Sequence, residues 1–62
     1  MSIRVEKNKY LNTWGVQPRG QGMWTFKIKN QDYTFKGTYA ECKAKAIRKA
    51  TALGAFEVIV MP

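Results

Sequence analysis

The hydrophobic pattern of the chain changes its period near Gly37. Before Gly37, apolar and polar residues alternate, most regularly over residues 23–29, where Trp24, Phe26 and Ile28 share one face. Strict alternation over a short segment is typical of a half-buried strand. We therefore predict a strand at 23–29 with an apolar inner face. Its outer face carries Met23, Thr25, Lys27 and Lys29.

Two further strands are expected beside this one. Alternation continues over 33–36 after the polar connection 30–32, which suits a hairpin. Residues 10–16 precede a turn rich in Gly and Pro at 17–22, and three apolar residues of that segment share one parity. The pattern thus predicts three antiparallel strands with one apolar face. The apolar positions of the first strand are Tyr10, Trp14 and Val16.

After Gly37 the pattern becomes helical. Thr38 and Glu41 have the spacing of a capping box, in which each side chain bonds the backbone N–H of the other residue. A helix over 39–53 follows, and Gly54 suits its C-terminal cap. The helical spacing predicts one buried stripe, formed by Tyr39, Cys42, Ala46, Ala50 and Leu53.

The last segment, 55–61, also reads as a strand, and it has apolar residues on both faces. Phe56, Val58 and Val60 share one of these faces, and a strand of this kind needs a pairing partner. The alternating segment 3–7 is a candidate partner. We predict a single α+β domain over 1–62, with the order β-β-β-α-β: an antiparallel three-stranded sheet packed on one helix, and an extra terminal strand.

Composition narrows the function. The chain has 62 residues, 11 Lys and Arg against 4 Asp and Glu, no His and one Cys. A domain this small has no room for a deep cavity, and the residue types for acid–base pairs, triads or His- and Cys-based metal sites are lacking. We therefore expect no enzyme, no catalytic residues, no cofactor and no metal. No apolar run is long enough for a transmembrane helix, and one Cys fits a reducing, cytoplasmic environment.

The outer face of the predicted sheet is the first candidate for function. Because donors and cations dominate it and no acid is expected among them, this face could neutralise phosphates and contact base edges of duplex DNA. The alternative is that this face has no binding role and is simply the solvated sheet surface of a basic protein. The candidate nucleic-acid-binding residues are Gln17, Arg19, Gln21, Thr25, Lys27, Lys29 and Lys36. A second basic group on the helix, Lys43, Lys45, Arg48 and Lys49, is more simply explained as a solvated face.

Residues 14–29 resemble the first two strands of the ethylene-response-factor type DNA-binding domain, which is related to domains in integrases and phage homing endonucleases. The matching residues are Gly15, Val16, Arg19, Gly22, Trp24 and Ile28, and 35–44 resembles that family's approach to its Ala-rich helix. The resemblance implies a three-stranded sheet that lies in the DNA major groove. It implies contacts from Gln17, Arg19, Gln21, Lys27 and Lys29. Gln17, Gln21 and Lys27 depart from the residues usual in that family, so no base preference is implied.

Three hypotheses about function follow. The first is a small DNA-binding module from a phage or mobile element that uses its sheet face. The second is a protein-interaction module, a homodimer or an inhibitor of a partner, that uses the apolar strand 55–61. The third is an RNA binder of the same architecture.

Overall fold

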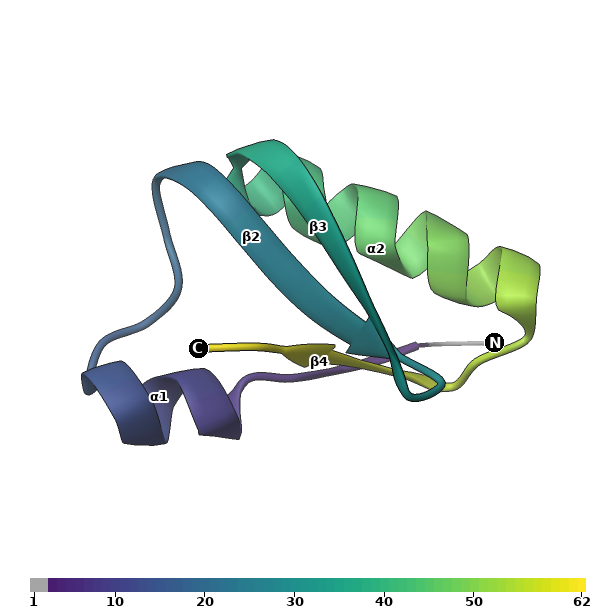
Figure 1. Ribbon diagram of the computed structural model, residues 1–62, viewed down its shortest axis with the longest axis horizontal. Helices are drawn as coiled ribbons and strands as arrows, with labels where there is room; N and C mark the ends of the chain where they lie inside the picture. Colours follow the sequence, from purple (N-terminus) through teal and green to yellow (C-terminus); the bar gives the residue numbers. More distant parts are fainter. Residues whose placement is uncertain (1–2) are drawn as a thin grey trace.

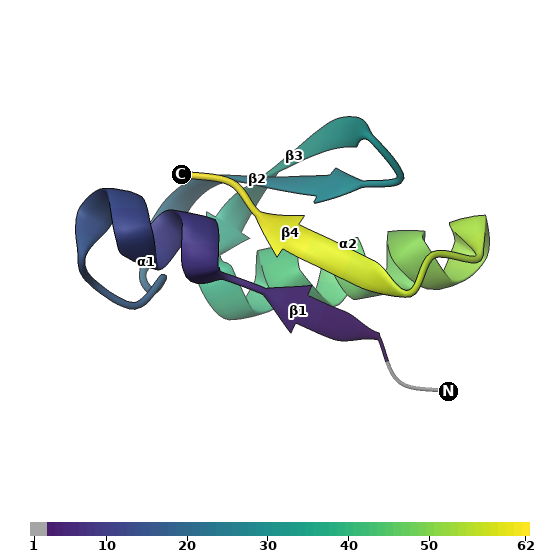
Figure 2. The same cartoon turned by 90° about the horizontal axis from the view of Figure 1, so that it is seen from below.

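A four-stranded mixed sheet with a long helix across one face forms the α+β architecture of the computed structural model, which describes residues 3–62 (Figure 1). The strand order is β1-β4-β2-β3, so β1 and β3 are the two edges. A short helix lies at one end of the sheet (Figure 2). In chain order the elements are β1 (Arg4–Glu6), α1 (Asn8–Trp14), β2 (Gln21–Ile28), β3 (Gln31–Thr38), α2 (Tyr39–Leu53) and β4 (Glu57–Val60).

The final strand lies inside the sheet. On one side β4 pairs in parallel with β1, with Val5 opposite Val58, and on the other it pairs antiparallel with β2, with Phe26 opposite Val60. The predicted pairing of the segments 3–7 and 55–61 is therefore confirmed. The β1–β4 pair is parallel, so the sheet is mixed. The sequence predicted antiparallel pairing for the strands within 10–36 and no direction for this pair.

The β2–β3 hairpin turns through two residues. Ile28 pairs with Gln31, and both Lys29 and Asn30 between them have positive φ angles, 50° and 66°. Two consecutive left-handed residues are typical of a type I′ turn, whose twist matches that of the strands it joins. The turn therefore comes earlier than the predicted connection at 30–32. The two strands form eight register pairs, so β3 begins earlier and ends later than the predicted 33–36.

Helix α2 has the predicted bounds. The Thr38 hydroxyl accepts from the Glu41 N–H at 3.2 Å, and the Glu41 carboxylate accepts from the Thr38 N–H at 3.1 Å, which confirms the capping box. Gly54 ends the helix in the left-handed conformation, with φ 72°. Gly37 is needed immediately before the helix, because its φ is 143° and an added Cβ would lie 3.2 Å from the Glu41 carboxylate.

The core lies between α2 and the inner face of the sheet. The small side chains of Cys42, Ala46 and Ala50 let the helix approach the sheet closely, as the stripe predicted. Leu53, the last residue of that stripe, is partly exposed. The buried sheet residues beneath the helix are Trp24, Phe26, Ile28, Val58 and Val60.

The predicted strand at 10–16 is wrong. Residues 10–14 form most of α1, Gly15 ends this helix in the left-handed conformation, and Val16 lies in the loop that follows. The error has a geometric cause, because Tyr10 and Trp14 are four residues apart. Four is a multiple of the strand period and close to the helical period, so both periods place these residues on one face. Their ring centroids lie 6.4 Å apart along the helix.

Candidate nucleic-acid interface

The face of the β2–β3 hairpin that points away from α2 brings three of the predicted site residues together. Because Trp24, Phe26 and Ile28 point toward the helix, Thr25 and Lys27 point away from it. Lys36 lies on the same face of β3, and Thr25 pairs with Thr34, their hydroxyl oxygens 3.0 Å apart. We call this uncovered surface of β2 and β3 the hairpin face. Its residues are Met23, Thr25, Lys27, Asp32, Thr34 and Lys36.

The other predicted site residues lie toward the two ends of the hairpin. Gln17 and Arg19 are exposed in the loop between α1 and β2. Gln21 is the first residue of β2, and it extends the hairpin face because it has the same parity as Met23. Lys29 is in the turn, at the opposite end of the strand. Eight residues of strand span about 27 Å. Arg19 and Lys29 therefore mark the ends of an elongated surface, with Lys27 and Lys36 between them.

The hairpin face carries an acid, which corrects the expectation of an acid-free sheet surface. Asp32 belongs to β3 rather than to the turn, and it lies directly opposite Lys27. The early turn is the cause, because it moves Asp32 into the strand. The surface nevertheless keeps a cationic excess, since Arg19, Lys27, Lys29 and Lys36 stand against this one carboxylate.

The part of the same sheet side formed by β1 and β4 is acidic in balance. Arg4 forms ion pairs with Glu6 at 3.0 Å and with Glu57 at 3.3 Å. The backbone N–H of Asn8, followed by the Arg4 guanidinium, lowers the pKa of Glu6 below its usual value. Two carboxylates thus surround one cation here. The cationic excess of this sheet side therefore lies in its β2–β3 half.

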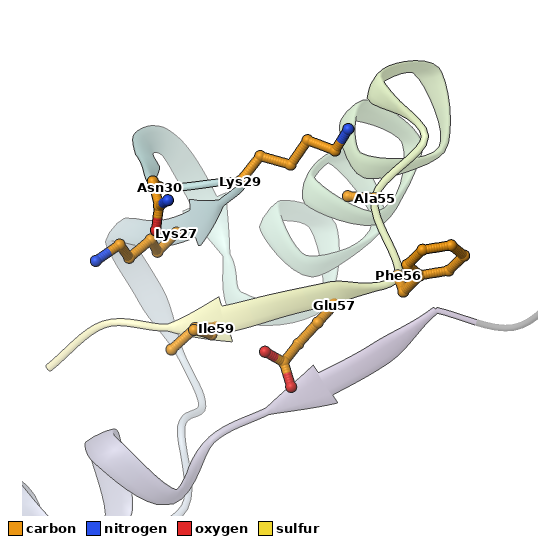
Figure 3. Close-up of a pocket in the computed structure, with 7 residues that line it drawn as sticks. All are labelled: Lys27, Lys29, Asn30, Ala55, Phe56, Glu57 and Ile59. Carbon is orange, nitrogen blue, oxygen red and sulfur yellow. The ribbon is translucent and has the colours of Figure 1, made fainter.

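A groove of about 330 Å³ opens between the tip of the hairpin and the start of β4 (Figure 3). Register pairing between β2 and β4 reaches Lys27 opposite Ile59 and extends no further toward the tip. The hairpin end therefore stands away from β4, as Figure 2 shows. The residues lining the groove are Lys27, Lys29, Asn30, Ala55, Phe56, Glu57 and Ile59.

Phe56 at the edge of this groove is 69% exposed, although the sequence predicted that it shares one strand face with Val58 and Val60, which are buried. Strand β4 starts at Glu57. Phe56 thus lies in the connection after α2, where the alternation of the strand does not hold it inward.

A second groove, of about 250 Å³, lies where α1 meets the sheet. Trp14 and Met23 line it and are 59% and 69% exposed. Tyr10 and Trp24 form its aromatic wall, with ring centroids 5.6 Å apart. The sequence placed Trp14 in the core, because its parity matched that of a strand. The strand interpretation therefore missed this exposed Trp, and a helical interpretation of 10–14 with Gly15 as its cap would have revealed it.

The basic residues of α2 lie on the other side of the domain. Lys43 and Lys49 extend over aromatic rings, with their ammonium nitrogens 5.8 Å from the Tyr39 centroid and 5.5 Å from the Tyr33 centroid. These interactions give both lysines a structural role at the helix–sheet boundary. Lys45 and Arg48 are exposed.

Within residues 3–62, no three His, Cys, Asp or Glu side chains gather closely enough to hold a metal ion. Over the same range, no helix is both long and apolar enough to cross a membrane. Cys42 is buried as a free thiol.

Comparisons with protein-family models, with curated proteins and with solved structures found no match to this chain. The resemblance to the ethylene-response-factor type domain therefore stays a prediction. The succession β2, β3, α2 follows the layout it implied, whereas residues 14–20, expected to contain its first strand, form a helix end and a loop.

Proposed function

We propose that this protein binds duplex DNA through the hairpin face. The observation that carries the proposal is the uncovered, cationic surface of β2 and β3, with Lys27 and Lys36 on one face and Arg19 and Lys29 at its ends. Lys and Arg side chains bind DNA by neutralising phosphates and releasing counterions, a contribution that does not depend on base sequence.

The shape of the hairpin supports this role. A two-stranded ribbon fits the major groove, which is about 12 Å wide. The hairpin end stands away from β4, so it projects as such a ribbon (Figure 2). Each strand of the hairpin has eight residues, which span about 27 Å and match about eight base steps at 3.4 Å each. Phosphate contacts would then come from Arg19, Lys27, Lys29 and Lys36, and base contacts from Gln21 and Thr25.

The protein-interaction alternative loses its original basis in the fold. The strand proposed to pair with a partner, within 55–61, is internal as β4, and its edges are occupied by β1 and β2. RNA binding through the same surface is the competing nucleic-acid hypothesis. The deep, narrow major groove of A-form RNA does not admit side chains, which favours duplex DNA for a projecting ribbon. We further propose a cytoplasmic role in a phage or mobile element, with which the buried free thiol of Cys42 is compatible.

The test is a fluorescence anisotropy titration of labelled duplex DNA at several salt concentrations. In the double variant Lys27→Gln/Lys36→Gln we expect weaker binding, and a salt slope smaller by about 0.9 for each phosphate that the protein no longer neutralises. The matched control is Lys45→Gln/Arg48→Gln, which removes the same charge from exposed positions on the helix. Net charge alone would weaken both double variants equally, and that result would contradict the proposal.

Competition with duplex RNA of the same sequence separates the two nucleic-acid hypotheses. If the RNA displaces labelled DNA as well as unlabelled DNA does, the groove argument fails. If wild-type protein binds neither nucleic acid at low salt, the proposed function is wrong.

A further inference from the structure

Strand β3 is an open edge of the sheet, and its free side carries regularly spaced backbone groups. In a hairpin with a two-residue turn, the residues flanking the turn exchange hydrogen bonds, and every second pair along the strands does the same. Gln31, Tyr33 and Phe35 therefore direct their backbone groups toward β2. The bond from the Tyr39 N–H to the Gly20 carbonyl, at 2.8 Å, continues this alternation beyond β3. The backbone N–H and C=O groups of Asp32, Thr34 and Lys36 thus point to the open edge.

This edge has little of the usual protection against pairing. Natural edge strands are commonly shortened, bulged, or interrupted by Pro or several charges. Within Gln31–Thr38 the eight register pairs with β2 are consecutive, and the segment contains no Pro. Its charges are Asp32 and Lys36, which are of opposite sign and lie at equal distances on either side of Thr34.

We propose that two copies of this chain associate through antiparallel pairing of their β3 strands, centred on Thr34. In this arrangement Thr34 lies opposite Thr34 of the second copy, and Asp32 lies opposite Lys36 of the second copy, twice by symmetry. The contact is isologous, as a two-fold dimer requires. Each of the three residue pairs is of the hydrogen-bonded kind, so the backbones exchange bonds at all three.

The neighbouring symmetric registers do not satisfy the charges. Centring on Tyr33 puts Asp32 opposite Thr34, and centring on Phe35 puts Lys36 opposite Thr34. A register centred between two neighbouring residues pairs each odd-numbered residue with an even-numbered one. A backbone group that faces the open edge then lies opposite one that faces β2, so the bonds cannot form. The register centred on Thr34 is therefore selected by charge as well as by hydrogen bonding.

The side chains on the helix side of the edge support the same register. Tyr33 and Phe35 are only half-buried in the single chain. In the proposed dimer, Tyr33 lies opposite Phe35 of the second copy, an aromatic cross-strand pair of the kind that stabilises sheets. Lys49, whose ammonium lies over the Tyr33 ring, comes near Lys49 of the second copy, and the two like charges repel. The paired segment of β3 is also short. We therefore expect a weak, concentration-dependent dimer.

Sedimentation velocity of the free protein, from micromolar to millimolar concentration, tests the proposal without any nucleic acid. Wild type should shift from monomer to dimer. Asp32→Lys and Lys36→Asp should each weaken association by about tenfold or more, since each turns two attractive pairs into repulsive ones. The double variant Asp32→Lys/Lys36→Asp restores opposite charges and should associate nearly as wild type does.

An equimolar mixture of the two single variants gives a sharper result. Each variant repels itself, but between the two variants every pair is again of opposite charge, so a heterodimer should form. Circular dichroism of each variant alone confirms that it is folded. Failure of the mixture to associate, or association of either single variant as tightly as wild type, would overturn the proposal.

The backbone contribution is tested by Thr34→Pro, with Thr34→Val as the matched control. Proline removes an N–H that faces the open edge and leaves the β2 ladder intact, so the variant should fold and remain monomeric. Valine keeps the N–H and should retain the dimer. A wild type that stays monomeric up to millimolar concentration, or a proline variant that dimerises normally, would contradict the proposed seam.

Discussion

The side chains of Thr38 and Glu41 bond each other's backbone N–H groups, and the Thr38 hydroxyl also donates to the Glu41 carboxylate at 3.0 Å. These bonds join the end of β3 to the start of α2. Since α2 forms one side of the core, these bonds fix the position at which the chain leaves the sheet and enters the helix that packs on it.

We predict that stability depends on the charge of Glu41. The Thr38 N–H, followed by the Thr38 hydroxyl, lowers the pKa of Glu41 in the folded protein below its ordinary value of 4.5. A lowered folded pKa means that this stabilisation is complete above the unfolded pKa and is lost as the pH falls through the folded pKa. Thermal unfolding of wild type and Glu41→Gln should therefore converge as the pH is lowered below about 4.5.

Glu6 also has a lowered pKa, so its protonation destabilises the fold in the same pH range. The difference between wild type and Glu41→Gln isolates Glu41, because both proteins keep Glu6. A difference that does not change between neutral and acid pH would contradict this prediction. Thr38→Ala should cost about 1 kcal/mol at neutral pH through loss of the cap.

Two phenylalanines give a matched test of the core. Phe26 is fully buried beneath α2, whereas Phe56 is largely exposed. Phe26→Ala should cost about 3–5 kcal/mol, enough to unfold a domain of this size, and Phe56→Ala should change stability by less than about 0.5 kcal/mol. Urea unfolding followed by circular dichroism measures both, and comparable destabilisation by the two variants would mean that the core is placed wrongly.

The type I′ turn predicts a stabilising substitution. Lysine is unfavourable in the left-handed conformation that Lys29 adopts, and Asn tolerates it better. Lys29→Asn should therefore stabilise the hairpin by about 0.5 kcal/mol, as judged from the urea midpoint. Lys27→Asn is the control, because it makes the same change within β2, where Asn is disfavoured. It should destabilise, and a decrease in stability from both variants would argue against the turn.

The two tryptophans predict distinct fluorescence. Trp24 is buried, and its indole N–H donates to the Gly20 carbonyl at 3.2 Å, whereas Trp14 is exposed. Acrylamide should quench wild type in two components, and Trp14→Phe should remove the accessible, red-shifted one. If Trp14 were part of a buried strand, wild type would show no accessible component, and Trp14→Phe would remove none.

Sequence patterns predicted the elements that local chemistry determines. The bounds of helix α2 were predicted correctly because the Thr38 box and Gly54 mark its ends, and because one stripe of its residues is small and apolar. The alternation of Trp24, Phe26 and Ile28 likewise identified β2 and its buried face. Each of these features lies within one segment of the chain.

The errors arose where one spacing fits two structures or where a turn sets the register. Tyr10 and Trp14 satisfy both a strand and a helix, and only the position of Gly15 as a cap separates the two. The left-handed pair at Lys29 moved Asp32 onto the hairpin face, which changed the charge of the candidate site. The parallel direction of the β1–β4 pair depends on tertiary contacts, which no local pattern specifies.

The interior position of β4 constrains how the protein is made. During synthesis β1, β2 and β3 leave the ribosome before the strand that must lie between β1 and β2, so the nascent chain holds a gap in its sheet until residues 57–60 emerge. Contacts between the first and last strands are distant in sequence, and such closures are slow compared with hairpin formation. Until then, apolar residues of β2 and α2 lack their cover. Premature termination before β4 would leave a chain with an unfilled sheet, open to aggregation and degradation.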